Sequence, residues 1–233
     1  MVVIQMTHIH GMRERFLRAS AMKVIKGMIV SIVRLVSNDR YSTNPAVVSC
    51  PRGDDPSTID QVDEVQILQC TATDGTFQLT FRGSHTDAIA FNANEVEIEA
   101  HLESLSTVDD VVVELTAGVA CSDQSTPHYI VVTFVTNHGD LPSIKPIVNN
   151  LIDVNNGNMA GSGTIAIFAD GQEIGGYTST RGTKEDDECS NKGICDYLTG
   201  QCICVAGYGS SDGKGNQGSK GDCGYRLPYA INE

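Results

Sequence analysis

The distribution of cysteines is the feature that most constrains this chain. Five of its eight cysteines lie in the last 45 residues, at Cys189, Cys195, Cys202, Cys204 and Cys223. The glycine-rich segment around them is too short to bury a hydrophobic core of its own, so disulfides must hold it together. Zinc is a poorer alternative, because no histidine follows His138 and Cys-x-Cys followed by eighteen residues is not a zinc spacing. The cysteines predict a disulfide scaffold and an oxidising, extracellular setting.

The charge of the chain restricts its partners. The net charge is −13, although residues 1–40 carry seven Lys and Arg against only two acidic residues. Because so acidic a body repels a phosphate backbone, we expect no nucleic-acid partner. The uncharged run from Gly27 to Val33 is far shorter than the ~20 residues of a spanning helix, so we expect no transmembrane segment.

The same run is at the lower limit for the apolar region of a signal peptide. A short basic amphipathic helix is the plainer alternative. We expect residues 1–45 to be an unstructured lead, or translated non-coding sequence in front of a secreted fragment. We expect residues 228–233 to be a short tail.

Alternating and β-branched runs predict a β-rich module over residues 46–183. The clearest element is a hairpin of Val65–Thr73 and Thr76–Arg82 joined by a tight turn at Asp74-Gly75, in which Phe77, Leu79 and Phe81 face inward. Further strands are predicted at Val108–Leu115, Tyr129–Val135 and Thr164–Ala169, with a second hairpin turn at Asp170-Gly171. Because Pro146 argues against a central strand, Ile144–Ile152 stays ambiguous. The fold class is α+β or β-rich: a sandwich-like module with one helix.

That helix is predicted over Glu95–Leu105. Asn92, three residues before Glu95, is typical of a capping box, and Ile98, Leu102 and Leu105 form a buried stripe. Three glutamates, at positions 95, 99 and 103, form a second stripe. A metal site is one interpretation of them, and an acidic helix face in water is the ordinary one.

Several of these segments resemble a known family. Residues 75–115, GTFQLTFRGSHTDAIAFNANEVEIEAHLESLSTVDDVVVEL, are similar to a module repeated in very large extracellular proteins. Together with CPRGDDPSTIDQVDEVQILQC (Cys50–Cys70), HGDLP (His138–Pro142) and GTKEDDECSNKGICD (Gly182–Asp196), the chain resembles stramenopile mastigoneme proteins. These proteins build the tubular hairs of heterokont flagella, and their relatives include sexually induced diatom surface proteins. The resemblance covers about residues 48–227.

Residues 184–227 resemble an EGF-like module of the tenascin type. That pattern has six cysteines, and the one before Cys189 is missing here. EGF topology implies the pairs Cys189–Cys202 and Cys204–Cys223. It leaves Cys195 without its usual partner, so Cys195 either bonds Cys50 and fastens the two modules together or bonds a neighbouring subunit. Within the first module we predict a Cys70–Cys121 bond. We expect the glycine-rich loop Gly209–Gly221 to be a flexible excursion.

Other motifs have ordinary explanations. Arg52-Gly53-Asp54 is an RGD tripeptide, but a turn formed with Asp55 and Pro56 accounts for it better than integrin adhesion. The acidic run Glu185–Glu188 is typical of calcium-binding EGF modules, although its companion pattern is absent. An exposed linker is the alternative, so we expect no cofactor and keep calcium as the one candidate ion.

No catalytic fingerprint is present, and we expect no enzyme. We expect His85 and His138 to lie in water.

The resemblance and the cysteines imply a function. We expect an extracellular structural protein at the flagellar or cell surface, a subunit of a filament such as a mastigoneme. Its partners would be other subunits or copies of the same module. The alternative is a recognition protein acting in cell–cell or gamete contact. Because Thr164–Ala169 carries no charge or proline, we expect this edge to be covered by the return segment Gly171–Tyr177 or to pair with a neighbouring module.

Overall fold

The structure is a computed structural model that describes residues 22–25, 28–31, 49–123 and 125–228. The chain divides into two compact units, Met1–Val47 and Val48–Glu233. In the first unit, β1 (Met22–Ile25) pairs antiparallel with β2 (Met28–Ser31). The expectation for residues 1–45 otherwise lies outside the described residues, as does that for residues 229–233.

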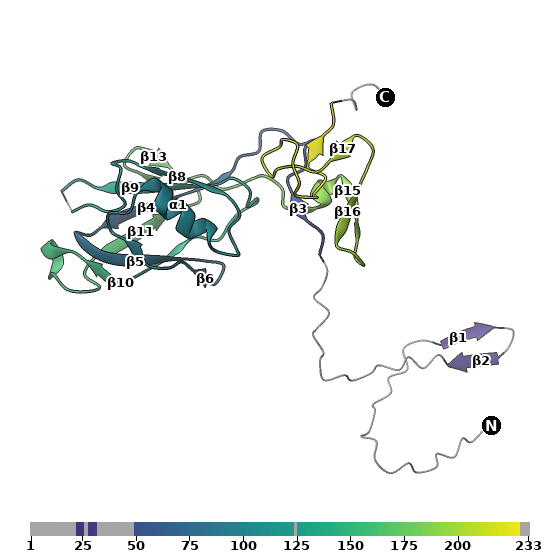
Figure 1. The fold of residues 1–233 in the computed structure, drawn as a ribbon, viewed down its shortest axis with the longest axis horizontal. Coiled ribbons are helices and arrows are strands. Elements are labelled where there is room, and N and C mark those ends of the chain that lie inside the picture. Colours follow the sequence, from purple (N-terminus) through teal and green to yellow (C-terminus); the bar gives the residue numbers. More distant parts are fainter. Residues whose placement is uncertain (1–21, 26–27, 32–48, 124, 229–233) are drawn as a thin grey trace, which may run out of the picture. The chain divides into compact units, whose positions relative to one another are not determined.

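The larger unit contains a β-sandwich, whose strands lie in two layers in Figure 1. All of its strand pairs are antiparallel. The first sheet has the order β11 (Thr164–Phe168), β4 (Glu64–Thr71), β9 (His128–Phe134) and β8 (Val111–Leu115). The second has the order β10 (Lys145–Ile152), β5 (Asp74–Phe81) and β6 (Ser84–His85), with β7 (Ile89–Ala90) also paired to β5. We call residues 64–180 the sandwich module.

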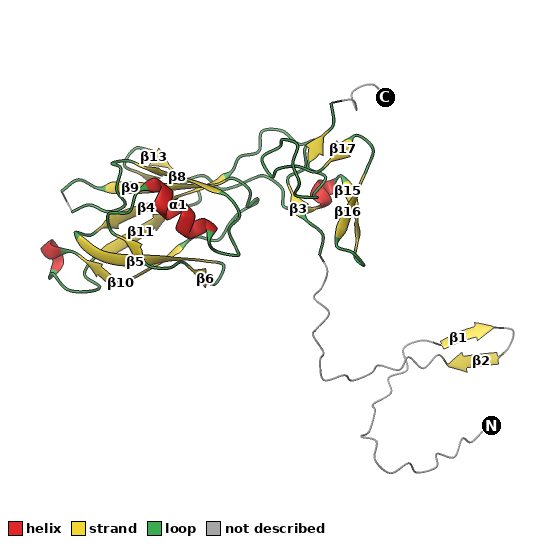
Figure 2. Cartoon of the chain, in the orientation of Figure 1, coloured by secondary structure: helices red, strands yellow, loops and turns green. Residues whose placement is uncertain are grey.

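The core lies between the two sheets and under α1 (Glu95–Glu103). Phe77, Leu79 and Phe81 point into it as predicted, and Phe81 stacks on Phe134 with ring centroids 5.0 Å apart. Figure 2 shows that strands and loops dominate the described chain. The expected β-rich fold with a single α-helix is confirmed for these residues. None of the described helices is both long and apolar enough to cross a membrane.

The predicted hairpin at Asp74-Gly75 is wrong. Asp74 and Gly75 are the first residues of β5, which belongs to a different sheet from β4, so the chain passes from one layer to the other just before them. Gly75 pairs with Leu151 of β10 and has φ +90°. A Cβ at Gly75 would overlap the Asn150 carbonyl oxygen. Glycine is therefore required for the close approach of β10, as well as for the turn. β10 is an end strand of its sheet, which is where Pro146 is tolerated.

The helix begins at Glu95 as predicted, but its N-cap lies two residues later than the predicted Asn92. Asn94, not Asn92, is the N-cap: its side chain accepts from the Glu97 N–H at 3.0 Å, and the Glu97 carboxylate accepts from the Asn94 N–H at 2.9 Å. This reciprocal pair is a capping box. Ile98, Leu102 and Leu105 are buried as predicted.

The glutamate stripe of α1 lies against the edge of β8. Glu95 accepts a hydrogen bond from the Leu115 N–H at 2.9 Å. Glu99 accepts from the Val113 N–H at 3.4 Å, and Glu103 from the Val111 N–H at 3.3 Å. Alternate N–H groups along the free edge of β8 are therefore occupied by carboxylates. The interpretation of the stripe as an acidic face in water was incomplete, because it did not bring the helix against a strand.

The other edge of the same sheet stays open. The return segment after β11 forms its own hairpin, in which β12 (Glu173–Ile174) pairs with β13 (Tyr177–Thr178). The rings of Tyr177 and Tyr129 lie 6.0 Å apart, and Gly175 packs against Tyr129. The hairpin thus lies over the outer face of the sheet and leaves the edge of β11 uncovered, so the expectation that the return segment covers it is wrong. The predicted turn at Asp170-Gly171 does not join paired strands.

One polar network is buried at the end of β4. The Gln66 side chain is fully buried; its Oε1 accepts from the Ile144 N–H at 2.8 Å, and its Nε2 donates to Glu64 Oε1 at 3.1 Å and to the Pro142 carbonyl at 3.3 Å. The Gly182 N–H donates to Glu64 Oε2 at 2.6 Å. The network fixes two loops to the sheet, and removing the Gln66 amide takes away the partner of the Ile144 N–H and of the Pro142 carbonyl.

We predict that Gln66→Leu lowers the free energy of unfolding by about 2–4 kcal/mol, because leucine fills a similar volume but makes none of these bonds. Urea unfolding measures the difference. Gln69→Leu, on the opposite face of the same strand, is the matched control and should change stability by less than about 0.5 kcal/mol. Equal losses in the two variants would contradict the role given to the network.

The remaining elements form a second, disulfide-rich module at the C-terminal end of the unit. Its short strands pair as three antiparallel couples: β3 (Arg52–Gly53) with β14 (Asp187–Glu188), β15 (Gly193–Asp196) with β16 (Gln201–Cys204), and β17 (Tyr208–Gly209) with β18 (Tyr225–Arg226). Two 3-10 helices, η1 (Val154–Asn156) and η2 (Cys189–Asn191), complete the described elements. We call residues 49–56 and 185–228 the C-terminal module.

Candidate functional site

Four disulfides join all eight cysteines in the structure. Cys70–Cys121 ties β4 to the loop before β9 with its Cα atoms 4.6 Å apart, well inside the limit of about 7 Å for a bond. The other three are Cys50–Cys195, Cys189–Cys202 and Cys204–Cys223, with Cα separations of 5.7, 5.5 and 5.4 Å. These are the pairs that the sequence suggested, and Cys195 takes the intramolecular alternative.

The Cys50–Cys195 bond shows that the C-terminal module is split in sequence. Cys50 supplies the cysteine that is missing before Cys189, from a position 145 residues ahead of Cys195. Strand β3 follows Cys50 and pairs with β14. Residues 50–55, which the sequence placed in the sandwich module, therefore lie in the C-terminal module. The whole sandwich module is an insertion between the first and second cysteines of the disulfide scaffold.

Six half-cystines take the place of a hydrophobic core in the C-terminal module. Four of them are buried in one cluster, and Cys202 and Cys204 pack against it. Gly193 fits only because it lacks a side chain, since a Cβ there would lie 2.8 Å from the Cys223 Sγ. Such a module depends on its crosslinks for stability, which fits a secreted or extracellular protein.

Asp55 anchors the point where the chain leaves β3 for the sandwich. Its buried carboxylate accepts hydrogen bonds from Lys192 Nζ at 2.7 Å, Asn191 Nδ2 at 2.9 Å and the Ser57 N–H at 2.9 Å. Burial alone would raise the pKa of Asp55, but these hydrogen bonds hold that pKa well below its usual range. The Thr58 N–H also donates to the Asp55 carbonyl at 3.1 Å. The turn predicted around Asp55 and Pro56 is present.

The RGD tripeptide is not displayed on a loop. Arg52 and Gly53 form β3, and the Arg52 guanidinium pairs with Asp186. Gly53 is buried, and a Cβ there would lie 2.6 Å from Ser190 Oγ. Gly53 is needed for packing inside the C-terminal module. This structural role explains the glycine of the tripeptide without a role in integrin adhesion.

Three of the segments that carry the family resemblance meet where the two modules join. Gly182 approaches Gly139 so closely that a Cβ would overlap the Gly139 carbonyl oxygen. His138 is 6% exposed, and burial lowers its pKa, so the expectation that it lies in water is wrong. It lines a small cavity of about 140 Å³ together with Asp54, Lys184 and residues of the 211–215 loop. The motifs CPRGDDP, HGDLP and GTKEDDE thus build one junction.

Asp54 and Glu185 form a carboxyl pair at this junction. The Glu185 N–H donates to Asp54 Oδ1 at 3.0 Å, and the two side chains share a hydrogen bond. Burial, and then this hydrogen bond with Glu185, raise the pKa of Asp54 to about 6. Two carboxyl groups this close hold one proton between them, and the pair loses it near that pH.

The pair makes stability depend on pH. Because the folded pKa of Asp54 lies above its value of about 4 in an unfolded chain, the folded state binds the extra proton, and its stabilising effect is lost as pH rises from about 4 to 6. We predict that Asp54→Asn removes this loss and is more stable than the wild type at pH 7 by about 1 kcal/mol, allowing for solvent screening. Urea unfolding between pH 4 and 7 measures it. Exposed Asp60→Asn is the control, and parallel pH profiles of wild type and Asp54→Asn would contradict the prediction.

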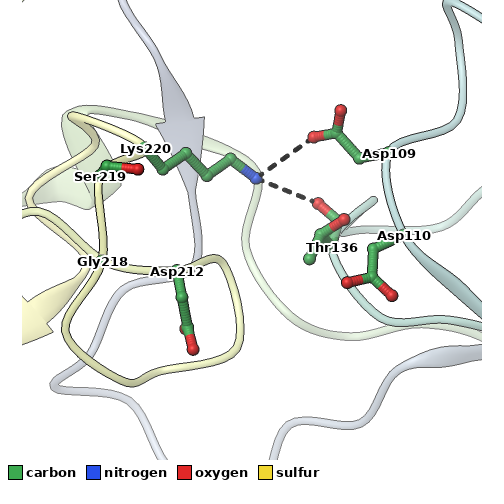
Figure 3. Close-up of a pocket in the computed structure, with 7 residues that line it drawn as sticks. All are labelled: Asp109, Asp110, Thr136, Asp212, Gly218, Ser219 and Lys220. Carbon is green, nitrogen blue, oxygen red and sulfur yellow. Dashed lines mark hydrogen bonds and ion pairs between the residues drawn. The ribbon is translucent and has the colours of Figure 1, made fainter.

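The loop Gly209–Gly221 is docked against the sandwich module, contrary to the expectation of a flexible excursion. Lys214 Nζ lies 2.6 Å from Asp110 Oδ2. Lys220 Nζ donates to the Thr136 carbonyl at 3.3 Å and lies 3.6 Å from Asp109 Oδ2, as Figure 3 shows. A cavity of about 400 Å³ remains between Lys220, these aspartates and Asp212. Two of its acids, Asp109 and Asp110, pair with Lys220 and Lys214, and these ion pairs join the two modules.

The acidic run does not converge on a common point. Glu185 accepts hydrogen bonds from Thr58 and Gln61, Asp186 pairs with Arg52, and Glu188 accepts from the Tyr197 hydroxyl at 2.8 Å. Three sulfurs, of Cys50, Cys189 and Cys202, do lie within 4.8 Å of one another. All three are in disulfides and offer no thiolate to a metal. The described contacts of the junction join the two modules.

An apolar face remains exposed on the β15–β16 hairpin. Ile194 and Ile203 are directly opposite each other and are 71% and 64% exposed. Leu198, in the turn between the strands, is 92% exposed. Exposed apolar side chains that cluster in this way mark contact surfaces.

The fold and the junction define a class: a disulfide-bonded, β-rich protein in which a β-sandwich is inserted into a small crosslinked module. No protein-family model matches the chain, and no curated protein matches it. The assignment of a function therefore depends on the junction itself and on the resemblance of its motifs.

Proposed function

We propose that this chain is a structural subunit of an extracellular filament such as the tubular hairs of heterokont flagella, with other subunits or copies of the same module as its partners. The proposal assigns it no catalysis. The observation that carries it is the Cys50–Cys195 bond. This bond takes the sandwich module out of the shortest covalent path through the chain, which runs from Cys50 to Cys195 and on through Cys204–Cys223.

A filament exposed to flow needs such a path. Tension along the chain is carried by two disulfides and a few residues of the C-terminal module, while the core of the sandwich bears no load. The contacts at the junction then keep the sandwich in a fixed position beside that path. The ion pairs of Lys214 with Asp110 and of Lys220 with Asp109 join the two modules and support this interpretation. The flagellar location rests on the resemblance of the motifs alone.

The alternative function is recognition at the cell surface, in cell–cell or gamete contact. The exposed apolar face of Ile194, Ile203 and Leu198 favours it, because a partner protein could cover this face.

Purified flagellar hairs distinguish the two functions. Antibodies against the sandwich module should label the hairs along their length, and the chain should be an abundant component of hairs dissolved under reducing conditions. Labelling confined to the cell body, with the protein captured on a soluble partner and absent from hairs, would overturn the filament proposal and support recognition.

A further inference from the structure

The outer edge of β11 offers free backbone groups. The Val65 and Thr180 main chains exchange two hydrogen bonds of 2.9 Å on the side of β4 that β11 occupies. In an antiparallel ladder, hydrogen-bonded pairs recur at every second residue. The register Gln69↔Ala166 has the same parity as Val65, so Ala166 bonds β4. The N–H and C=O groups of Ile165 and Ile167 consequently point away from the sheet.

The other edges of the sandwich are blocked. The three glutamates of α1 occupy the edge of β8. β10 carries Lys145 and Pro146 and is interrupted by a register shift between Ile147 and Asn150. On the far side of the second sheet, β6 and β7 are only two residues long. Charges, proline, bulges and short strands are the devices that prevent strand addition. Among the described edge strands of the sandwich, β11 alone has none of them.

The open edge is also held in place before any partner binds. The Gly163 N–H, just before β11, donates to the Leu151 carbonyl of the other sheet at 3.2 Å. Beyond the other end of β11, the backbone of Thr180 is hydrogen-bonded to Val65 of β4. Ile165 and Ile167 pack against the core, and exposed Ala166 lies between them on the outer face. Strand addition here needs little ordering of the edge, which lowers its entropic cost.

We propose that β11 is a self-association edge, which pairs antiparallel with β11 of a second copy of this chain. With Ala166 opposite its own equivalent, Ile165 lies opposite Ile167, and the outward groups of both make four backbone hydrogen bonds across the two-fold axis. The strand TIAIF carries no charge that would repel its copy, and alanine is small enough for two copies to meet. Because the other edges are blocked, a second copy has only its own β11 to offer. The contact closes as a dimer.

This inference goes beyond the proposed function, since it concerns an edge that the junction does not use. A dimer in solution is expected whether or not the chain belongs to a flagellar hair.

Sedimentation of the full oxidised chain over a range of concentrations tests it. The wild type should form a concentration-dependent dimer. Ala166→Lys sets two like charges opposite each other and should raise the dissociation constant about tenfold or more. Val112→Lys, at an exposed position on β8, is the matched control and should dimerise like the wild type. Mixing the Ala166→Lys and Ala166→Glu variants should restore the dimer as a mixed pair.

A cysteine variant tests the register. In the proposed pairing the two Ala166 Cα atoms are a non-hydrogen-bonded pair about 4.5 Å apart, a distance that a disulfide spans. Ala166→Cys should crosslink into dimers on mild oxidation, and Val112→Cys should not. A wild type that stays monomeric overturns the proposal, as does equal crosslinking of the two variants. A dimer that survives Ala166→Lys but is lost in Ile203→Lys overturns it too, because the contact would then be the β15–β16 face.

Discussion

Pulling the oxidised protein apart from Ser49 and Pro228 will leave the sandwich module folded. The force enters at Cys50, crosses to Cys195, follows the backbone to Cys204 and leaves through Cys223. None of the sandwich strands lies on this path, so their hydrogen bonds carry no tension. Single-molecule force spectroscopy should record only the short extension of the C-terminal module before the attachment breaks.

Removing one crosslink should change this result completely. In the Cys50→Ser/Cys195→Ser double variant the force must pass through the backbone of the sandwich. Because Cys70–Cys121 still closes its loop of 51 residues, about 90 residues become extensible, which is roughly 300 Å at ~3.4 Å per residue.

The Cys70→Ser/Cys121→Ser double variant is the control. It weakens the sandwich by about 4 kcal/mol in the chain-entropy model but leaves the load path intact, so no long extension should occur. Long unfolding steps in the oxidised wild type would show that the junction does not shield the sandwich.

The cysteine pairs were accessible from the sequence, since few connections were open. Eight cysteines, an EGF-like spacing over the last five and two cysteines within one β-rich module leave little choice for Cys50 and Cys195. The split of the module was not accessible in the same way. Cys50 stands in a short polar segment, and only the pairing of β3 with β14 shows that this segment belongs to a module 130 or so residues later.

Strand positions were predictable, and strand partners were not. The alternation in Thr76–Phe81 identified β5 and its buried face. Asp74-Gly75 has the composition of a hairpin turn, and the same two residues also suit a passage between sheets. What decides between them is β10, some 70 residues later, whose backbone packs against Gly75. Non-local contacts of this kind leave no local signal.

The glutamates of α1 also have a role that depends on a non-local contact and could not be predicted from the sequence. Their spacing places them on one helix face, but it does not reveal what that face meets. In the structure it meets the edge of β8, and the spacing of every fourth helical residue matches every second residue of the strand, at Leu115, Val113 and Val111. The three glutamates that occupy the edge of β8 were therefore interpreted as a helix face exposed to water.

Replacing these three glutamates by alanine should turn a closed assembly into an open one. The Glu95→Ala/Glu99→Ala/Glu103→Ala variant loses about 1–2 kcal/mol of stability in total, as the hydrogen bonds to β8 are exchanged for water. Its larger effect is on association. With β8 uncovered, one copy presents two different open edges, and β8 can add to β11 of the next copy. Head-to-tail contacts of this kind do not close, so the product should be a growing fibre where the wild type stops at the dimer.

Light scattering and electron microscopy of the oxidised variants test this prediction. A matched variant that removes three exposed acids away from this edge, Asp60→Asn/Asp87→Ala/Glu173→Ala, makes the same change in net charge and should not form fibres. Adding Ala166→Lys to the glutamate variant should stop its growth, because the partner edge at β11 is then blocked. The prediction fails if the glutamate variant associates no further than the wild type: a folded variant that stops at the dimer would show that the three carboxylates only stabilise the fold. The edge of β8 would then be closed to strand addition even without them.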